Sequence, residues 1–479
     1  MSRGLAAALL AAALPASAAE PDAWARFRGP NGSGVAESPP LPLRLGEESR
    51  IWRTPLPPGF SSPVLDAERI YLTGLDGEAL VTLALERESG RIVWRREAPR
   101  PRREKLDRRN HPAAASPVTD GQRVFAFFAD FGLLAYTTAG EPLWQHPMGP
   151  FDNVYGMGAS PVLVGELLVM LVDQSTGSYL LALDAATGAE RWRRERPGAR
   201  SGHATPIVHR SGTGGEQILV AGSFRLTAYA AADGTPIWWA DGLSFEIKST
   251  PVISGDTLYI NGYGSPLNQP GKQVRIPDFE TALGTGDADG DGRLAPDECP
   301  EGHVREWFDF VDLDRSGTLE AADWSYLEAA LASTNGLLAI ALGGEGDVTA
   351  TAIRWTYHRA VPQLPSPLLY GAALYTVNDG GIVTMLGPET GERLAQGRLT
   401  GAVDSYYASP VAADGKIWFV SEHGKVAVIE PDAGLDVLAV SELDELCYAT
   451  PAISDGRLYL RTQQALYAFG LTGEPPKAP

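Results

Sequence analysis

One dipeptide recurs along this chain and limits the architectures that the chain can adopt. Ser or Thr followed by Pro opens an apolar run eight times, with the prolines at Pro63, Pro117, Pro161, Pro206, Pro251, Pro367, Pro410 and Pro451. Six of the seven intervals between them are 41–54 residues long, which suits one four-stranded propeller blade each. The remaining interval is 116 residues. The spacing therefore predicts an all-β protein, an eight-bladed β-propeller with a helical insertion in blade five.

Each copy of the repeat has the composition of short antiparallel strands joined by turns. In the third copy a short strand, Pro161–Val164, is followed by a later one that ends in Leu181–Asp184. Regularly spaced short strands indicate an all-β array rather than βαβ units, and Pro is tolerated as the first residue of a strand. A Gly-x-x-x-Trp spacing recurs at Gly90/Trp94, Gly140/Trp144, Gly188/Trp192 and Gly234/Trp238. We interpret these Trp side chains as packing between blades, with ligand stacking as the alternative.

The two ends of the repeat array predict how the ring closes. The eighth copy stops at Phe469 after three strands, whereas Arg50–Arg53 has the pattern of a fourth strand without the first three. Pairing these segments would complete blade eight and leave no unpaired strand edge. Gly391 and Gly434 have no Trp four residues later. We therefore expect blades six and seven to pack differently on their neighbours.

Two phrases carry a resemblance to a known family. Ala182–Trp192 reads ALDAATGAERW, and Trp24–Gly34 reads WARFRGPNGSG. They resemble the repeat and an N-terminal signature of PQQ-type propellers, the family of quinoprotein dehydrogenases and BamB-like outer-membrane assembly proteins. The resemblance covers nearly all of the chain outside the insertion. It implies either a scaffolding role or PQQ-dependent oxidation, and the second needs a PQQ site with a catalytic Asp and its own Ca²⁺.

Motifs that identify enzymes are scarce in this chain. The adjacent cysteines of methanol-oxidising quinoproteins and the haem-attachment motif CxxCH are absent, as are the Gly-x-Ser-x-Gly elbow, the Walker loop and His-Glu-x-x-His. PQQ as a cofactor therefore has no support from the residues, and no catalytic residue is assigned. We favour a monomeric binding or scaffolding protein with a protein or small-molecule partner. A PQQ-dependent oxidoreductase and a carbohydrate- or peptide-processing enzyme that uses the channel mouth are the alternatives.

The N-terminus has the pattern of a secretion signal. Arg3 precedes the apolar run Leu5–Leu14, and Ala16–Ala18 is a small-x-small cleavage site. We expect residues 1–18 to be removed and the protein to be periplasmic or secreted, with a retained N-terminal anchor as the alternative. The apolar run is too short to span a bilayer, and we expect no integral membrane segment. A net charge of −19 argues against nucleic acid as a partner.

The insertion divides the rest of the chain. We assign residues 19–264 to the N-terminal segment, the closing strand and blades one to five (first half), 265–334 to the insertion, 335–470 to the rest of blade five and blades six to eight, and 471–479 to a tail. Within the insertion, apolar residues at helical spacing predict helices over Val304–Val311 and Trp324–Leu331. The helix signal before residue 287 is poor.

A twelve-residue segment of the insertion, here called loop one (Asp287–Glu298), matches the calcium-binding loop of an EF-hand. Ca²⁺ takes six to eight oxygen ligands, and this loop supplies them at the required positions. Gly292 at position 6 allows the sharp turn. The predicted ligands are the carboxylates at positions 1, 3, 5 and 12 and a backbone carbonyl at position 7, which are Asp287, Asp289, Asp291, Glu298 and Arg293.

A second match, here called loop two (Asp312–Asp323), follows after 25 residues. Its predicted ligands are Asp312, Asp314, Ser316, Thr318, Glu320 and Asp323. Asp323 at position 12 has a shorter side chain than Glu, so we expect loop one to bind more tightly. We expect one or two Ca²⁺ ions in a structural role rather than a switch, because extracellular calcium modules bind at about 10⁻⁴–10⁻³ M. Solvated acidic turns are the alternative.

Topology predicts a candidate binding face at the channel mouth. In a four-stranded blade, the loop that enters strand one lies on the same face as the loop between strands two and three. The residues just before each Ser/Thr-Pro should therefore surround the mouth. They are Asn110, His111, Asn153, Tyr155, His203, Glu246, Lys248, Gln363, Asp404, Tyr407 and Tyr448. Ligand sites occupy such mouths, although ordinary solvated loops are the alternative.

The two cysteines permit one further hypothesis. Cys299 follows the last ligand of loop one, and Cys447 lies on the loop that enters blade eight. In an oxidising compartment they could form a disulfide that holds the insertion as a lid over the mouth. Two unrelated buried thiols are the favoured alternative.

Overall fold

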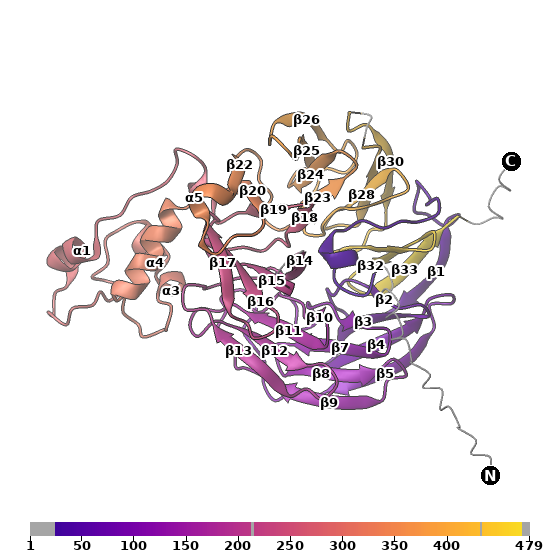
Figure 1. Ribbon diagram of the computed structural model, residues 1–479, viewed down its shortest axis with the longest axis horizontal. Coiled ribbons are helices and arrows are strands. Elements are labelled where there is room, and N and C mark those ends of the chain that lie inside the picture. The colour runs from indigo at the N-terminus through magenta and orange to yellow at the C-terminus, as the bar shows by residue number, and fades with distance from the viewer. Residues whose placement is uncertain (1–23, 212–214, 432–433, 472–479) are drawn as a thin grey trace, which may run out of the picture.

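The computed structural model describes residues 24–211, 215–431 and 434–471, which form eight β-sheets around a central channel (Figure 1). The predicted signal peptide, residues 1–18, lies outside the described residues, and so does the predicted tail apart from residue 471. None of the helices in the described ranges is long and apolar enough to cross a membrane.

Each sheet is one blade, and the strands of a blade follow one another in the chain except in blades five and eight. Blade one contains β2 (Val64–Leu65), β3 (Arg69–Asp76), β4 (Ala79–Glu86) and β5 (Ile92–Ala98); blade two contains β6 (Val118–Thr119), β7 (Arg123–Phe128), β8 (Gly132–Thr137) and β9 (Pro142–Pro147); blade three contains β10 (Val162–Val164), β11 (Leu167–Val172), β12 (Tyr179–Asp184) and β13 (Glu190–Glu195). Blade four contains β14 (Ile207–Ser211), β15 (Gly215–Ala221), β16 (Arg225–Ala230) and β17 (Pro236–Asp241); blade five contains β18 (Val252–Ser254), β19 (Thr257–Gly262), β20 (Gly336–Ala341) and β22 (Ile353–Tyr357). Blade six contains β23 (Leu368–Tyr370), β24 (Ala373–Asn378), β25 (Ile382–Leu386) and β26 (Arg393–Arg398); blade seven contains β27 (Val411–Ala413), β28 (Lys416–Val420), β29 (Lys425–Ile429) and β30 (Val437–Glu442).

Blade eight closes the ring in the predicted way. It contains β31 (Ala452–Ser454), β32 (Arg457–Arg461), β33 (Ala465–Gly470) and β1 (Arg50–Pro55), and β1 pairs antiparallel with β33. The prediction of eight blades with an N-terminal closing strand is therefore confirmed. The inner strands are apolar and buried on both faces because neighbouring blades cover them, whereas an outer strand such as β13 alternates between exposed and buried residues.

Five Trp side chains join neighbouring blades by one repeated contact. Each covers the turn glycine of the next blade, where an added Cβ would lie 2.5–2.7 Å from the indole, and each donates its Nε1–H to a backbone carbonyl there at 2.8–3.0 Å. They are Trp52, Trp94, Trp144, Trp192 and Trp355. Gly434 of blade seven has nothing within 4 Å of its Cβ position. The prediction of different packing is thus confirmed at the interface between blades six and seven.

Blade four departs from the four-stranded pattern. A fifth short strand, β21 (Gly346–Asp347), runs parallel to β17, and the helix α5 (Thr349–Ala352) follows it. Trp238 has no turn glycine to cover here, and it donates instead to Oε1 of Gln217 in its own blade at 3.2 Å.

The segment of residues 24–36 crosses the channel in the centre of the ring (Figure 1). It includes the short 3-10 helix η1 (Pro30–Gly32) and bonds to the first strands of blades one, two, four, six and seven. The bonds run between Leu65 N–H and Trp24 O, Thr119 N–H and Ala25 O, Arg26 and Pro206 O, Arg28 and Pro367 O, and Ala412 N–H and Gly34 O. These contacts are made at the Pro of the Ser/Thr-Pro dipeptide in blades four and six and two residues after it in blades one, two and seven, so the segment closes that end of the channel.

The chain between β19 and β20 forms a helical unit that projects outward from the ring (Figure 1). It contains η2 (Pro266–Asn268), α1 (Phe279–Gly286), α2 (His303–Glu306), α3 (Phe308–Val311) and α4 (Ala321–Ala332) around an apolar core of its own. The sequence signal for α1 is poor. The helix nevertheless forms because Asp278 caps it by accepting the N–H of Thr281 at 2.8 Å, and because Ala282 is buried in the unit's core.

The lid and disulfide hypothesis is wrong. Cys299 is buried in the core of the insertion and Cys447 in the core around blade eight, and both are free thiols. The insertion projects outward beside the ring instead of folding across the mouth (Figure 1), and its second apolar surface, Phe310, Leu313, Tyr326 and Ala330, packs on Phe224 and Phe245 at the edge of blade four.

Candidate functional site

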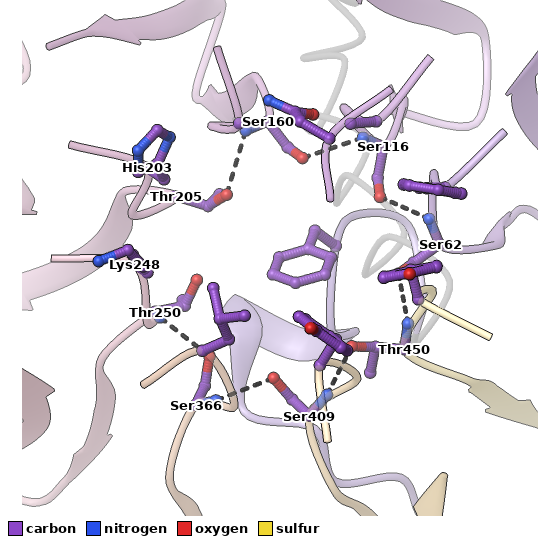
Figure 2. Close-up of a pocket in the computed structure, with 18 of the residues that line it drawn as sticks. Ser62, Ser116, Ser160, His203, Thr205, Lys248, Thr250, Ser366, Ser409 and Thr450 are labelled. Carbon is purple, nitrogen blue, oxygen red and sulfur yellow. Dashed lines mark hydrogen bonds between the residues drawn. The ribbon is translucent and has the colours of Figure 1, made fainter. Parts of the chain in front are cut away.

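The eight Ser and Thr hydroxyls of the repeat form a belt around the channel (Figure 2). In seven of the eight steps the backbone N–H of one residue donates to the hydroxyl of its counterpart in the next blade at 2.8–3.1 Å. The order is Ser62, Ser116, Ser160, Thr205, then Thr250, Ser366, Ser409, Thr450 and back to Ser62. Only the step from Thr205 to Thr250 lacks this bond among the described residues.

These bonds explain why the repeat requires a hydroxyl before its Pro. A hydroxyl oxygen has two lone pairs and one O–H, and the bond from the neighbouring blade uses one lone pair. The second lone pair and the O–H remain available to a molecule in the channel. The sequence analysis used the Ser/Thr-Pro dipeptide to find the blades but gave a reason only for the Pro; the role of the hydroxyl was missed, although the restriction to Ser or Thr at all eight positions was its signal.

Above the belt, toward the mouth, lies a cavity of about 220 Å³. Phe27 of the N-terminal segment also lines the cavity, so the cavity is closed at that end and does not run through the ring. The aromatic part of the wall is continuous: Phe60 stacks on Tyr448 at 4.2 Å between ring centroids, and Tyr407 lies 4.9 Å from Tyr448. Tyr155 supplies a further aromatic face.

The cations at the cavity are matched by carboxylates. Arg109 Nε lies 2.7 Å from Asp107 Oδ1, and Lys248 Nζ lies 2.5 Å from Glu246 Oε2. Glu246 is 2% exposed. Burial alone would raise the pKa of its carboxyl group, but Lys248 and His203 outweigh burial and lower the pKa to about 2. Each cation of the wall is thus matched by a carboxylate, and the two pairs together add no net charge to the wall.

Seven of the eleven predicted mouth residues line this cavity: Asn110, Tyr155, His203, Lys248, Gln363, Tyr407 and Tyr448. Apart from the belt, seven residues of the wall were missed, namely Phe27, Phe60, Asp107, Arg109, Ala114, Gly158 and Leu364. Phe60 and Leu364 are apolar, and a search for polar loop residues does not select them. Phe27 comes from a segment that no repeat pattern places.

The other four predicted mouth residues stand behind or beside the wall. His111 packs against the Phe60 ring at 5.0 Å, and burial lowers the pKa of its imidazole to about 4. Asn153 accepts the N–H of Tyr155 at 3.0 Å, and Glu246 supports Lys248. Asp404 accepts the Ser421 hydroxyl at 2.8 Å and lies 2.9 Å from Nδ1 of His423, so it belongs to the rim of blade seven.

In loop one three of the five predicted ligands converge. One carboxylate oxygen from each of Asp287, Asp289 and Asp291 lies within 4.8 Å of the others. Glu298 points back into the loop, where it accepts the N–H groups of residues 288 and 295, positions 2 and 9, at 2.8 Å each. The donor set is made of oxygens, which suits a hard cation such as Ca²⁺. Arg293 at position 7 extends its side chain to Glu320 of loop two at 2.9 Å.

Loop two repeats these internal bonds. Asp323 accepts the N–H groups of Leu313 and Glu320, again positions 2 and 9, at 3.1 and 3.0 Å. Asp312 accepts the N–H groups of residues 316 and 317, Asp314 accepts that of Ser316, and the Ser316 hydroxyl donates to the carbonyl of Thr318. Leu294 and Leu319 join the two loops by a two-way backbone bridge at 3.1 and 2.8 Å. The Glu320 side chain forms an ion pair with Arg293, and of the two loops, as far as the structure describes them, only loop one has three carboxylates within 4.8 Å of one another.

PQQ does not fit the residues of the cavity. Its three carboxylates would need unpaired cations, whereas Arg109 and Lys248 are already paired. Its metal partner would need free carboxylates at the cavity, and Asp107 is held by Arg109. No step through this cofactor follows from the geometry.

Comparisons with known proteins agree with the fold. The family model described as "Outer membrane protein assembly factor BamB" matches residues 45–260 and 176–282. No curated protein matches the chain. Among solved structures, BamB from Moraxella catarrhalis is 12% identical with a TM-score of 0.55, covering 89% of this chain and 98% of its own. A europium-containing methanol dehydrogenase is 9% identical with a TM-score of 0.57, covering 95% and 99%, and the computationally designed Ika8 protein is 9% identical with 0.54, covering 88% and 99%. At these identities the similarity shows the fold alone.

Proposed function

The chain belongs to the PQQ-type β-propeller family, and on that premise we propose that it is an exported binding protein. It takes a small, uncharged, polyhydroxylated ligand at its channel mouth and holds calcium in its insertion.

The proposed class of ligand rests on one observation: each cation at the cavity is paired with a carboxylate. A charged ligand would meet no net opposite charge there, and the overall charge of −19 repels anions. A neutral polyol finds complementary groups instead. The hydroxyl belt both donates and accepts hydrogen bonds, Asn110 and Gln363 add amides, and the faces of Tyr155 and Tyr448 can cover the C–H face of a ring. A monosaccharide has this chemistry.

The same groups argue for binding rather than catalysis. Lys248 Nζ is bonded to Glu246 and is not a free nucleophile. The Ser201 hydroxyl donates at 2.6 Å to Glu246, whose pKa of about 2 makes the carboxylate a weak base, and Ser201 itself does not line the cavity. An enzyme at this mouth would need a nucleophile–base pair that faces the cavity.

The calcium proposal rests on the matched internal bonds of loop one and loop two. In both loops the residue at position 12 accepts the N–H groups of positions 2 and 9, and the residue at position 1 accepts the N–H of position 6. In loop one this arrangement accompanies three carboxylates within 4.8 Å of one another, an oxygen donor set that suits Ca²⁺. We propose an EF-hand pair with loop one as the tighter site.

Saturation-transfer NMR on the full chain tests the ligand class with glucose, N-acetylglucosamine and glucuronate as probes. The two neutral sugars should receive saturation, and glucuronate should not. Tyr448→Ala should weaken binding roughly tenfold through the lost ring contact, whereas the control Tyr370→Ala, which is outside the cavity wall, should have no effect. Selective binding of glucuronate would contradict the class. Sugar binding that is unchanged in Tyr448→Ala would contradict the assignment of the binding site to the cavity.

A protein partner is the second candidate occupant of the same mouth, and the similarity to BamB favours it. Capture from the native envelope that requires Tyr448 would assign the mouth to a protein instead of a sugar.

A further inference from the structure

Loop two contacts the propeller through the residues that lie between its predicted metal ligands. The ligands are at positions 1, 3 and 5, which are Asp312, Asp314 and Ser316, whereas Leu313 at position 2 and Arg315 at position 4 reach the propeller. Loop one has only Ala288 and Gly290 at these positions, and both are exposed. Positions 2 and 4 therefore contact the propeller in loop two but not in loop one, although the internal bonds of the two loops match.

Arg315 connects loop two to the segment that enters blade three. Its guanidinium forms an ion pair with Asp152. The next residue, Asn153, accepts the N–H of Tyr155 at 3.0 Å and donates to the carbonyl of Asp173 at 3.0 Å. A displacement of Asp152 would thus be passed to Tyr155, whose ring lines the cavity.

Leu313 connects loop two to the segment that enters blade five. Leu313, Phe245 and Tyr326 are buried in one small cluster, and Phe245 lies 5.9 Å from the Phe310 ring in an edge-to-face contact. Phe245 is the residue before Glu246, which holds Lys248 in the cavity wall. The N–H of Leu313 itself donates to Asp323, the ligand at position 12, so the residue that packs on Phe245 is also tied to the metal loop.

The two connected segments meet each other at the cavity. Lys248 Nζ lies 5.9 Å from the centroid of the Tyr155 ring, and that ring lies 6.1 Å from the imidazole of His203. From outside the ring, loop two therefore contacts both of the segments that position Tyr155 and Lys248 in the cavity wall.

We propose that cation binding in loop two regulates the ligand cavity by ordering the segments 152–155 and 245–248. The inference rests on the proposed function, since it assigns a regulator to the same site. An ion would fix the backbone of Asp312–Ser316 and with it Leu313 and Arg315. The Tyr155–Lys248 side of the wall would then be held in one arrangement, and ligand affinity would rise because less freedom is lost on binding. This role revises the expectation of purely structural calcium sites.

Hydrogen–deuterium exchange of the full chain, with and without millimolar CaCl₂, tests the proposal without any cavity ligand. Calcium should slow the exchange of peptides 150–158 and 243–250 by on the order of threefold or more, together with peptides of the insertion. The mouth segment 403–408 of blade seven does not touch the insertion and should be unchanged. Asp312→Ala should abolish the effect on both cavity segments, and Asp287→Ala in loop one should preserve it.

A second variant tests the contact between Arg315 and Asp152 separately from calcium binding. Arg315→Gln keeps every predicted ligand, so calorimetry should still detect calcium, but the protection of 150–158 should be lost while that of 243–250 remains. Arg275→Gln, at an exposed residue of the insertion outside both loops, is the control and should leave both protected. Protection confined to the insertion would overturn the coupling and leave the calcium and sugar proposals standing. No change anywhere would overturn calcium binding and the coupling together, whereas sugar binding would stay a separate result.

Discussion

The backbone N–H of Thr450 donates to the hydroxyl of Ser62 at 2.9 Å, across 388 residues of sequence. This bond closes the hydroxyl belt at the channel, just as the pairing of β1 with β33 closes the ring at its outer edge. Blade eight is thus joined to blade one twice. A belt bond joins two buried groups, and each N–H would be without a partner if its hydroxyl were removed.

The belt predicts a difference between two Thr residues that occupy equivalent positions. Thr450 Oγ1 accepts the N–H of Ser409 at 3.0 Å, whereas the Thr250 hydroxyl accepts no belt bond, although the Thr250 N–H donates one to Ser366. Thr450→Val should lower the free energy of unfolding by about 1–3 kcal/mol, the cost of a buried N–H without a partner. Thr250→Val makes the same change of shape and should cost clearly less. Urea unfolding of both variants provides the measurement, and equal losses would mean that the belt bonds do not stabilise the ring.

The contacts between Trp side chains and turn glycines predict that alanine substitutions at two of these glycines differ in their effect on stability. Gly234 and Gly434 have φ angles of 71° and 75°, so an alanine at either position has the same backbone strain, about 1–2 kcal/mol. An added Cβ at Gly234 would also lie 2.6 Å from the Trp192 ring, whereas Gly434 has nothing within 4 Å. Gly234→Ala should therefore destabilise the protein by about 1–3 kcal/mol more than Gly434→Ala. Thermal unfolding compares them, and equal melting temperatures would contradict the role of the Trp contact.

The repeat made the fold predictable because its spacing and its Ser/Thr-Pro start are local properties of each blade. The closing strand could be predicted as well, since Arg50–Arg53 has the pattern of an outer strand and the eighth copy lacks one. The cavity could be predicted only in part. The mouth residues just before each Pro follow from topology, but Phe27 depends on how a segment without any repeat crosses the channel.

The direction of the insertion could not be read from the sequence. Phe224 and Phe245 lie in loops of blade four and before blade five, and nothing in their sequence neighbourhood marks them as partners of Leu313 and Tyr326. Contacts between segments that are distant in sequence depend on the three-dimensional course of both. The disulfide hypothesis failed for this reason, because it assumed that the insertion turns inward.

The buried pair of Glu246 and Lys248 predicts a pH dependence. The folded pKa of Glu246, about 2, lies below the ordinary value of 4.5, so the ionised carboxylate stabilises the fold above about pH 4.5. That contribution is lost as the pH falls from 4.5 toward 2. Glu246→Gln should cost roughly 3–5 kcal/mol near neutral pH because Lys248 loses its partner, and the difference from wild type should shrink on acidification. Urea unfolding at several pH values measures it.

The double variant Glu246→Gln with Lys248→Met is the control for this pair. It removes both charges and should recover part of the lost stability at neutral pH. A difference between wild type and Glu246→Gln that does not change between pH 6 and pH 2.5 would show that the pair is not ionised in the folded protein.

The two loops predict two calcium sites of unequal affinity. Loop one has four carboxylates among its predicted ligands, including Glu298 at position 12, whereas Asp323 has a shorter reach. Titration calorimetry should resolve two sites in the wild type, with the tighter one removed by Asp287→Ala and the weaker one by Asp312→Ala. Absence of calcium heat at millimolar concentration, or loss of the tighter site in Asp312→Ala, would contradict the assignment.

The close approach of the two ends of the insertion predicts that the propeller folds without the insertion. The two ends of the insertion lie together: the N–H of Gly264 donates to Oδ1 of Asn335 at 2.8 Å, and the Asn335 amide donates to the carbonyl of Ser265 at 2.8 Å. β19 and β20 pair up to Gly262 and Gly336. A short Gly-Ser turn in place of residues 266–333 can therefore close the hairpin with little strain, because a two- to five-residue loop suits antiparallel neighbours.

The deletion should leave a folded ring that is less stable and binds no calcium. It exposes Phe224 and Phe245, which the insertion covers in the full chain, at a cost of roughly 1.5–3 kcal/mol for each fully exposed ring. Replacing both rings by Ser in the shortened chain should suppress association through this new apolar surface. Circular dichroism, thermal unfolding and size-exclusion chromatography measure these effects. If every linker length yields only aggregates, with and without the Ser replacements, the contacts of Leu313 and Tyr326 with blade four are needed for the ring itself to fold.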